Sequence, residues 1–188
     1  MISPEEQGRA NLYGLLARLF HAPPDAALLK ALAAERLDGE LADAWQGVAS
    51  AAASADPEAV REEYETAFIG TGKAPVTLYT TAYSIRYSNE TPLADLRGEL
   101  ARLGLARRVD VYEPEDHIAA LCDTMRHLVA QQKSDLEEQR RFFHKWIQPA
   151  AAPLCAAIEN SDQTSFYKPV ARFATGFFDL EQLAFEML

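Results

Sequence analysis

Apolar residues recur three and four positions apart along nearly the whole chain. The clearest stripe consists of Ile118, Leu121, Cys122, Met125, Leu128 and Val129. This spacing places the six side chains on one face of an α-helix. Shorter stripes with the same period lie within residues 12–20, 60–68 and 173–183. The pattern therefore predicts an all-α protein.

Helix-starting signals divide the chain into segments. Ser3-Pro4-Glu5-Glu6 is a capping box, and Ser134-Asp135-Leu136-Glu137 reads as a second one. We expect a long helix to begin at Pro114 and a last helix near Thr164. The strand-like alternation at 109–111 is too short to build a sheet. Short loops between helices predict a compact bundle, and residues 1–188 fit one domain.

The net charge of −10 restricts the choice of partner. Nucleic acids and anionic membranes both need a basic surface, so neither is expected as a partner. The charge favours a cationic partner, although it also serves solubility alone. The sequence shows no long apolar run and no basic start followed by an apolar one. We expect a cytoplasmic protein without membrane insertion.

Signatures of catalysis and of metal binding are weak. Cys122 and Cys155 are too few for a zinc site, and Cys122 lies within the apolar stripe, which predicts burial. Asp123 and His127 lie one helical turn apart and read as a solvated surface pair. The loop at 70–73 lacks the spacing of a nucleotide-binding loop, although weak phosphate binding stays open. We predict no metal, no cofactor and no enzymatic activity.

Two segments are candidates for binding. Glu113-Pro114-Glu115-Asp116-His117 combines three acids with a titratable imidazole, and either helix capping or ligand binding would account for it. Residues 74–87 place Tyr79, Tyr83 and Tyr87 four apart behind a Gly- and Pro-containing loop. Tyrosine is favoured at binding surfaces, and it also fills helix cores. Together the two segments predict a groove for a peptide.

These motifs, in this order, resemble one known family. Glu63-Tyr64-Glu65-x-x-Phe68, the Pro75–Tyr83 loop and Glu113-Pro114-Glu115-Asp116-His117 are similar to the TorD/DmsD family of cytoplasmic redox-enzyme chaperones. The Phe142-Phe143, Trp146-x-x-Pro149 and Phe166-Tyr167 stretches match its C-terminal pattern. The Glu-Pro-x-Asp-His element is the most specific of these.

The resemblance implies an all-α chaperone of the TorD-like type. Such proteins bind the twin-arginine signal peptide, and often the body, of a molybdopterin-dependent oxidoreductase until its cofactor is inserted, which holds back export. The implied peptide-binding residues are Pro75, Leu78, Tyr79, Tyr83, Glu113, Pro114, Asp116 and His117. Related chaperones carry tryptophans in the loop where this chain has tyrosines, which leaves the client enzyme open.

The acids at Glu113, Glu115 and Asp116 are expected to meet the arginines of such a peptide, and the loop at 78–83 its apolar part. Two alternatives remain: a helical enzyme or metal-binding protein that uses Asp116 and His117, and a ligand-sensing domain of a regulator. The client enzyme, and the choice between monomer and homodimer, are not determined by the sequence.

Overall fold

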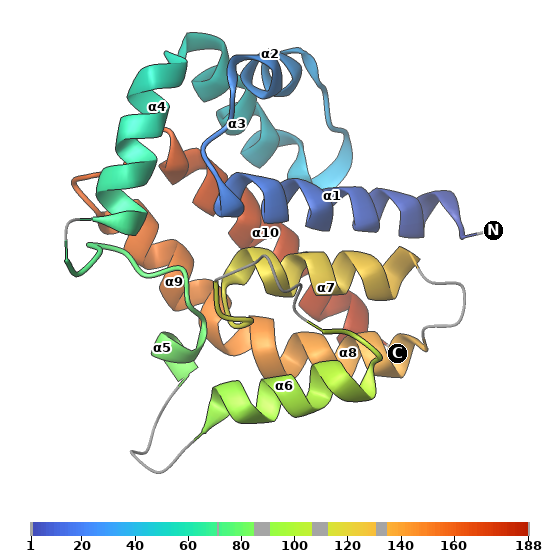
Figure 1. Cartoon of the computed structure of the whole chain (residues 1–188). Coiled ribbons are helices and arrows are strands. Elements are labelled where there is room, and N and C mark those ends of the chain that lie inside the picture. Colours follow the sequence, from blue (N-terminus) through green and yellow to red (C-terminus); the bar gives the residue numbers. More distant parts are fainter. Residues whose placement is uncertain (1, 71, 85–90, 107–112, 131–134, 188) are drawn as a thin grey trace. The chain divides into compact units, whose positions relative to one another are not determined.

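The computed structural model describes residues 2–70, 72–84, 91–106, 113–130 and 135–187. Helices account for the regular structure of these residues, and the only β-type pairing among them is one isolated bridge (Figure 1). The all-α prediction is confirmed. Contacts group the chain into two compact units, residues 1–21 with 78–150 and residues 22–77 with 151–188. The expected single domain stays a prediction, and each unit is described by itself.

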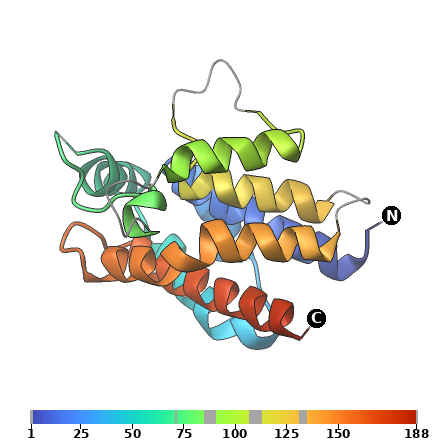
Figure 2. The same ribbon diagram turned by 90° about the horizontal axis from the view of Figure 1, so that it is seen from below.

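The first unit is built around one helix pair. Its helices are α1 (Pro4–His21), α5 (Thr81–Ser84), α6 (Pro92–Arg102), α7 (Ile118–Ala130) and α8 (Leu136–Phe142). Helix α1 packs against α7. The predicted stripe of α7 is buried, as are Leu16 and Phe20 of α1. Figures 1 and 2 show α1, α6, α7 and α8 with roughly parallel axes, and Figure 1 shows that α1 and α8 run in the opposite direction to α6 and α7.

Capping groups fix the ends of two of these helices. The Ser3 backbone N–H donates to Glu6 Oε2 (3.0 Å) and the Glu6 N–H donates to Ser3 Oγ (3.1 Å), so the first capping box is confirmed. At α8 the cap is Asp135, which accepts from the backbone N–H of Glu137. Ser134, the predicted cap, lies outside the described residues, as does the 109–111 segment.

Helix α8 continues without a break through a π-helical turn, η3 (Phe143–Ile147), into α9 (Gln148–Asn160), which ends in the second unit. Pro149 explains the wider turn. A proline has no N–H for the carbonyl four residues earlier, and its ring clashes with that carbonyl. The Gln148 N–H accordingly donates to the Phe143 oxygen, five residues earlier.

Glu99 ties α6 to the α8–η3 segment. Its carboxylate accepts from Trp146 Nε1 (2.9 Å) and lies 3.4 Å from Lys145 Nζ and 3.5 Å from Arg141 Nε. The Glu99 side chain is only 9% exposed. Hydrogen bonds to ionised groups are stronger than neutral ones when water is excluded, so this carboxylate fixes where α6 lies in the unit.

The second unit contains α2 (Ala26–Ala34), the 3₁₀ turn η1 (Gly39–Leu41), α3 (Ala42–Ser54), α4 (Pro57–Tyr64), the π-helical turn η2 (Glu65–Ile69) and α10 (Tyr167–Glu186). Helix α3 contacts both α2 and α10. Trp45 of α3 packs edge-on against Phe173 of α10, with ring centroids 5.2 Å apart. Gly70, with φ 61°, ends η2, as expected for a helix C-cap.

Glu63 of α4 holds the start of α10. Its two carboxylate oxygens accept from the backbone N–H groups of Ser165 (2.9 Å), Phe166 (3.0 Å) and Tyr167 (2.9 Å). These are among the N–H groups that a helix start leaves without an intrahelical partner. A negative charge is also favoured at this end of the helix dipole. Phe68 and Tyr167 pack edge-on beside it, 4.9 Å apart.

Candidate functional site

Residues 113–117 form a turn that precedes α7. The His117 N–H donates to the Pro114 oxygen (3.3 Å), and α7 begins at Ile118. The prediction of a helix start at Pro114 was therefore wrong by one turn. A distant partner decides the conformation here: His117 forms an antiparallel bridge with Tyr79.

This bridge joins the two segments that the sequence singled out. The Thr80 N–H donates to the Asp116 oxygen, and the Ile118 N–H donates to the Leu78 oxygen, each at 2.9 Å. The rings of Tyr79 and His117 meet edge-on with centroids 5.4 Å apart. The prediction that the acidic segment and the tyrosine loop lie together is thus confirmed for residues 78–80.

Asp116 is a buried part of this junction, with 5% of its surface exposed. The Thr81 hydroxyl donates to Asp116 Oδ2, which connects the carboxylate to the start of α5. The Thr80 hydroxyl donates to the Asp116 main-chain oxygen (3.1 Å). Asp116 is therefore engaged in holding the tyrosine loop in place.

His117 is equally buried and caps α7. Its Nδ1 accepts from the Ala119 N–H (3.2 Å), and its carbonyl accepts from the N–H groups of Ala120 and Leu121. Burial lowers the pKa of His117, and nearby His21 lowers it further, against the opposing carboxylates of Glu113 and Asp116. The neutral imidazole is the form that can accept at Nδ1, so its electrostatic surroundings favour the cap.

Tyr79, Glu113 and Glu115 lie beside this junction and differ in exposure. Tyr79 is 37% exposed. Burial raises the pKa of its phenol, as do the charges of Glu113 and Asp116. Glu113 Oε2 lies 3.4 Å from His21 Nδ1 at the end of α1, and 43% of its side chain is exposed. Glu115 accepts at both oxygens from Arg97 Nε, each at 3.1 Å, and its side chain is only 11% exposed.

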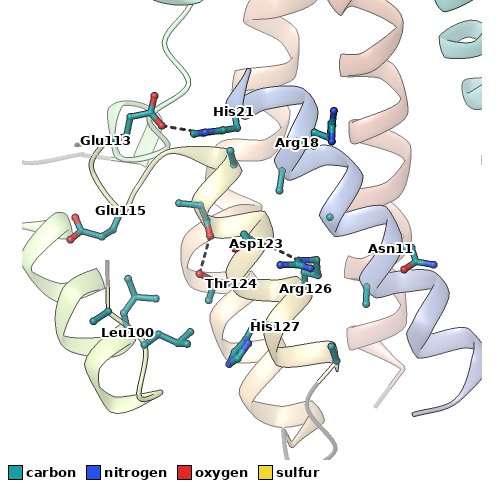
Figure 3. A pocket seen from close by; sticks show the side chains of 18 of the residues that line it. Asn11, Arg18, His21, Leu100, Glu113, Glu115, Asp123, Thr124, Arg126 and His127 are labelled. Carbon is teal, nitrogen blue, oxygen red and sulfur yellow. Dashed lines mark hydrogen bonds and ion pairs between the residues drawn. The ribbon is translucent and has the colours of Figure 1, made fainter. Parts of the chain in front are cut away.

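A groove of about 860 Å³ extends from these acids along α7 (Figure 3). One wall is α1, with Asn11, Arg18 and His21; the other is the end of α6 and the residues that follow it, with Leu100 and Leu105. Helix α7 forms its floor, with Ala119 and Ala120 near the acidic end and the charged or polar side chains of Asp123, Thr124, Arg126 and His127 farther along. Glu113, Pro114 and Glu115 line the end next to the Tyr79–His117 bridge.

The structure places the other predicted residues as follows. Leu78 is buried at 2% exposure and Tyr83 is half-buried in α5. Pro75 is exposed and belongs to the second unit, and Tyr87 lies outside the described residues. The partners His21 and Arg97 had no signal in the sequence, because they come from helices distant in the chain.

The remaining candidate groups behave as surface or core residues. Asp123 and His127 are exposed as expected, and Asp123 pairs with Arg126 (2.8 Å). Cys122 and Cys155 are buried, and burial raises the pKa of Cys155 to about 11. Among the described residues, no three His, Cys, Asp or Glu side chains gather as metal ligands would. No helix in the described ranges is long and apolar enough to cross a membrane.

Grooves between helices, such as the one in this unit, are a common place for ligand binding. Residues 34–156 match the model of the family described as nitrate reductase delta subunit, and the chain belongs to that family. A relative is the chaperone protein TorD of Photobacterium profundum, 28% identical over 129 residues that cover 61% of this chain and 58% of the relative. The chain thus spans less than two thirds of that relative. The resemblance to the TorD/DmsD family is confirmed, and its named relative is a chaperone and not a catalyst.

Proposed function

We propose that this chain is a cytoplasmic chaperone for a molybdopterin-dependent oxidoreductase. It binds the twin-arginine signal peptide and the apo form of the catalytic subunit, assists insertion of the cofactor and holds back export. The observation that carries the proposal is the groove beside α7, whose end is formed by the acidic segment Glu113–Glu115 next to the exposed ring of Tyr79. The family membership and the TorD relative support the same function.

The predicted peptide-binding residues differ in burial, and we assign them different roles accordingly. Glu113, Pro114 and Tyr79 offer surface to a ligand, whereas Asp116 and His117 are 5% exposed and shape that surface from within. Leu78 anchors the loop by its main-chain bond to Ile118. Tyr83 and Pro75 stay in the proposed site as expectations from the resemblance.

The alternative of an enzyme that uses Asp116 and His117 has less support. The Asp116 carboxylate accepts from the Thr81 hydroxyl, and His117 Nδ1 accepts from a backbone N–H. A general base needs its acceptor atom directed at a substrate proton. Asp116 Oδ2 and His117 Nδ1 are both directed at the protein itself, which does not favour either atom as a general base.

Calorimetry with a synthetic twin-arginine signal peptide tests the proposal. We expect a micromolar dissociation constant, equivalent to about −8 kcal/mol. Tyr79→Ala, which removes the exposed ring next to the acidic end of the groove, should weaken binding, whereas Leu136→Ala, which removes an exposed apolar side chain of α8, should not. Absence of binding to the unaltered protein, or equal effects of the two variants, would contradict the proposed site.

A further inference from the structure

Three cationic side chains meet on the first unit, away from the residues that line the groove. They are Arg102 at the end of α6, Arg141 of α8 and Lys145 of η3, and we call them the cationic cluster. Their side chains are 49%, 46% and 51% exposed, respectively. The lining of the groove includes none of the three. Because the chain carries a net charge of −10, the cluster differs in sign from the protein as a whole.

Glu99 holds the cationic cluster together from within. Its carboxylate lies 3.6 Å from Arg102 Nη2, 3.5 Å from Arg141 Nε and 3.4 Å from Lys145 Nζ. Burial acts to raise the pKa of Glu99, but the Trp146 N–H and the charge of Lys145 outweigh burial and lower it, so the carboxylate is ionised. The Glu99 side chain is only 9% exposed, so its charge gathers the cations without facing the solvent. A ligand therefore meets cationic groups that are already brought together.

A second carboxylate, that of Glu138, lies at the surface of the cluster. It is 27% exposed and lies 3.1 Å from Arg102 Nη1 and 3.6 Å from Arg141 Nη2. Three cations against two carboxylates leave one positive charge in excess. Arg141 is the cation held least closely, because its nearest carboxylate oxygens lie at 3.5 and 3.6 Å. Charge-assisted hydrogen bonds are shorter, at about 2.7–2.9 Å, so the Arg141 guanidinium has capacity for another acceptor.

The small excess of charge and the spacing of the cations restrict the ligand. A nucleic acid needs a broad basic surface, which a chain of net charge −10 does not offer. Arg141 and Lys145 are four positions apart, so they lie about one helical turn, or about 6 Å, from each other along the α8–η3 segment. Acidic side chains four positions apart on another helix have the same spacing. The cluster thus matches a short acidic helix.

We infer that the cationic cluster docks an acidic segment of a partner protein, in which two carboxylates one helical turn apart pair with Arg141 and Lys145. This contact goes beyond the proposed function, because it does not depend on what the groove binds. The guanidinium of Arg141 suits bidentate pairing with one carboxylate, and the ammonium of Lys145 pairs with the other as a point charge. Glu138 acts as an internal competitor, since an incoming carboxylate replaces it beside Arg141.

Binding of an acidic peptide tests the inference. The probe is a fluorescein-labelled, alanine-rich helical peptide with glutamates four positions apart, followed by fluorescence anisotropy at an ionic strength of about 0.01 M, where screening is weak. Arg141→Gln should weaken binding about two- to fivefold, the effect of one exposed ion pair. Arg61→Gln is the matched control, because Arg61 is 47% exposed, is paired with two carboxylates of the second unit and changes the net charge equally.

A variant with the opposite expected sign separates binding from folding. Glu138→Gln removes the competitor and should strengthen binding about two- to fivefold, which damage to the fold would not do. A peptide with glutamine in place of glutamate should not bind, and an ionic strength of about 0.15 M should weaken binding of the acidic one. Arg141→Gln should leave binding of a twin-arginine peptide unchanged, so failure of this inference is distinguishable from failure of the proposed function.

Three results would overturn the inference. The first is that the acidic peptide does not bind the unaltered protein. The second is that Arg61→Gln weakens binding as much as Arg141→Gln, or that Glu138→Gln does not strengthen it, because net charge alone would then account for the affinity. The third is that inorganic pyrophosphate displaces the labelled peptide at a lower concentration than the unlabelled peptide does, because the cluster would then prefer a compact oxyanion.

Discussion

Removing the carboxylate of Glu63 should destabilise the protein more than removing any other carboxylate of α4. The carboxylate accepts three backbone N–H bonds at the start of α10, at 2.9–3.0 Å. Loss of a helix cap costs about 0.5–2 kcal/mol, and loss of the favourable charge at the helix dipole adds about 0.3–1 kcal/mol. Because three donors lose their partner at once, we expect Glu63→Ala to cost about 2–3 kcal/mol of the free energy of unfolding.

The assay is thermal unfolding followed by far-ultraviolet circular dichroism. For a chain of this length, 1 kcal/mol corresponds to about 2–4 °C, so Glu63→Ala should lower Tm by roughly 5–10 °C. Glu63→Gln keeps one acceptor oxygen and should lose about half as much. Glu62→Ala is the matched control, since Glu62 is exposed and adjacent. Equal shifts for Glu62→Ala and Glu63→Ala would refute the capping role.

Three further predictions concern the junction and the core. Thr81→Val should weaken peptide binding as much as Asp116→Ala, because each variant removes one partner of the same hydrogen bond, and calorimetry would show unequal losses if the bond were unimportant. The lowered pKa of His117 means that, as pH falls through the ordinary histidine value of about 6.5, the unfolded chain takes up a proton that the folded one resists. The contribution of neutral His117 to the free energy of unfolding should thus be full above that pH and decrease below it. Tm should therefore fall between pH 8 and pH 5 more in the wild type than in His117→Asn, and parallel profiles would count against this. Cys155, buried and with its pKa raised to about 11, should react with a thiol reagent in denaturant only, and rapid reaction of the native protein would show that it is accessible.

Local patterns in the sequence predicted α1, α4, the body of α7, α8 and α10. The stripe from Ile118 to Val129 and the capping box at Ser3 involve residues a few positions apart, and such contacts depend little on the rest of the fold. The start of α7 was misplaced because Pro114 is a good first residue of a helix, but a bond from Thr80 to Asp116 holds the following residues in a turn. The hydrophobic period within one segment carries no information about pairing with a segment far away in the sequence.

The proximity of the acidic segment and residues 78–80 was predicted, whereas the burial of the individual side chains was not. The sequence indicated that the acids and the tyrosines form one surface, but exposure depends on distant partners. Arg97 donates a hydrogen bond to Glu115, and Thr81 donates one to Asp116. Neither partner can be identified from the spacing or composition of the sequence. The capping of α10 by Glu63 spans about a hundred residues of sequence and had no local signal either.

The Tyr79–His117 bridge also determines how the site opens. Its two main-chain bonds connect segments about 36 residues apart, so the entropy of closing that stretch opposes them. Breaking them leaves the α1–α7 pair intact, which makes the opening a local event of lower free energy than global unfolding. The amide protons of Thr80 and Ile118 should consequently exchange with solvent earlier than those in the middle of α7. A bound peptide that contacts this junction would slow the exchange of these two amide protons. Their exchange rates would therefore show whether a peptide is bound.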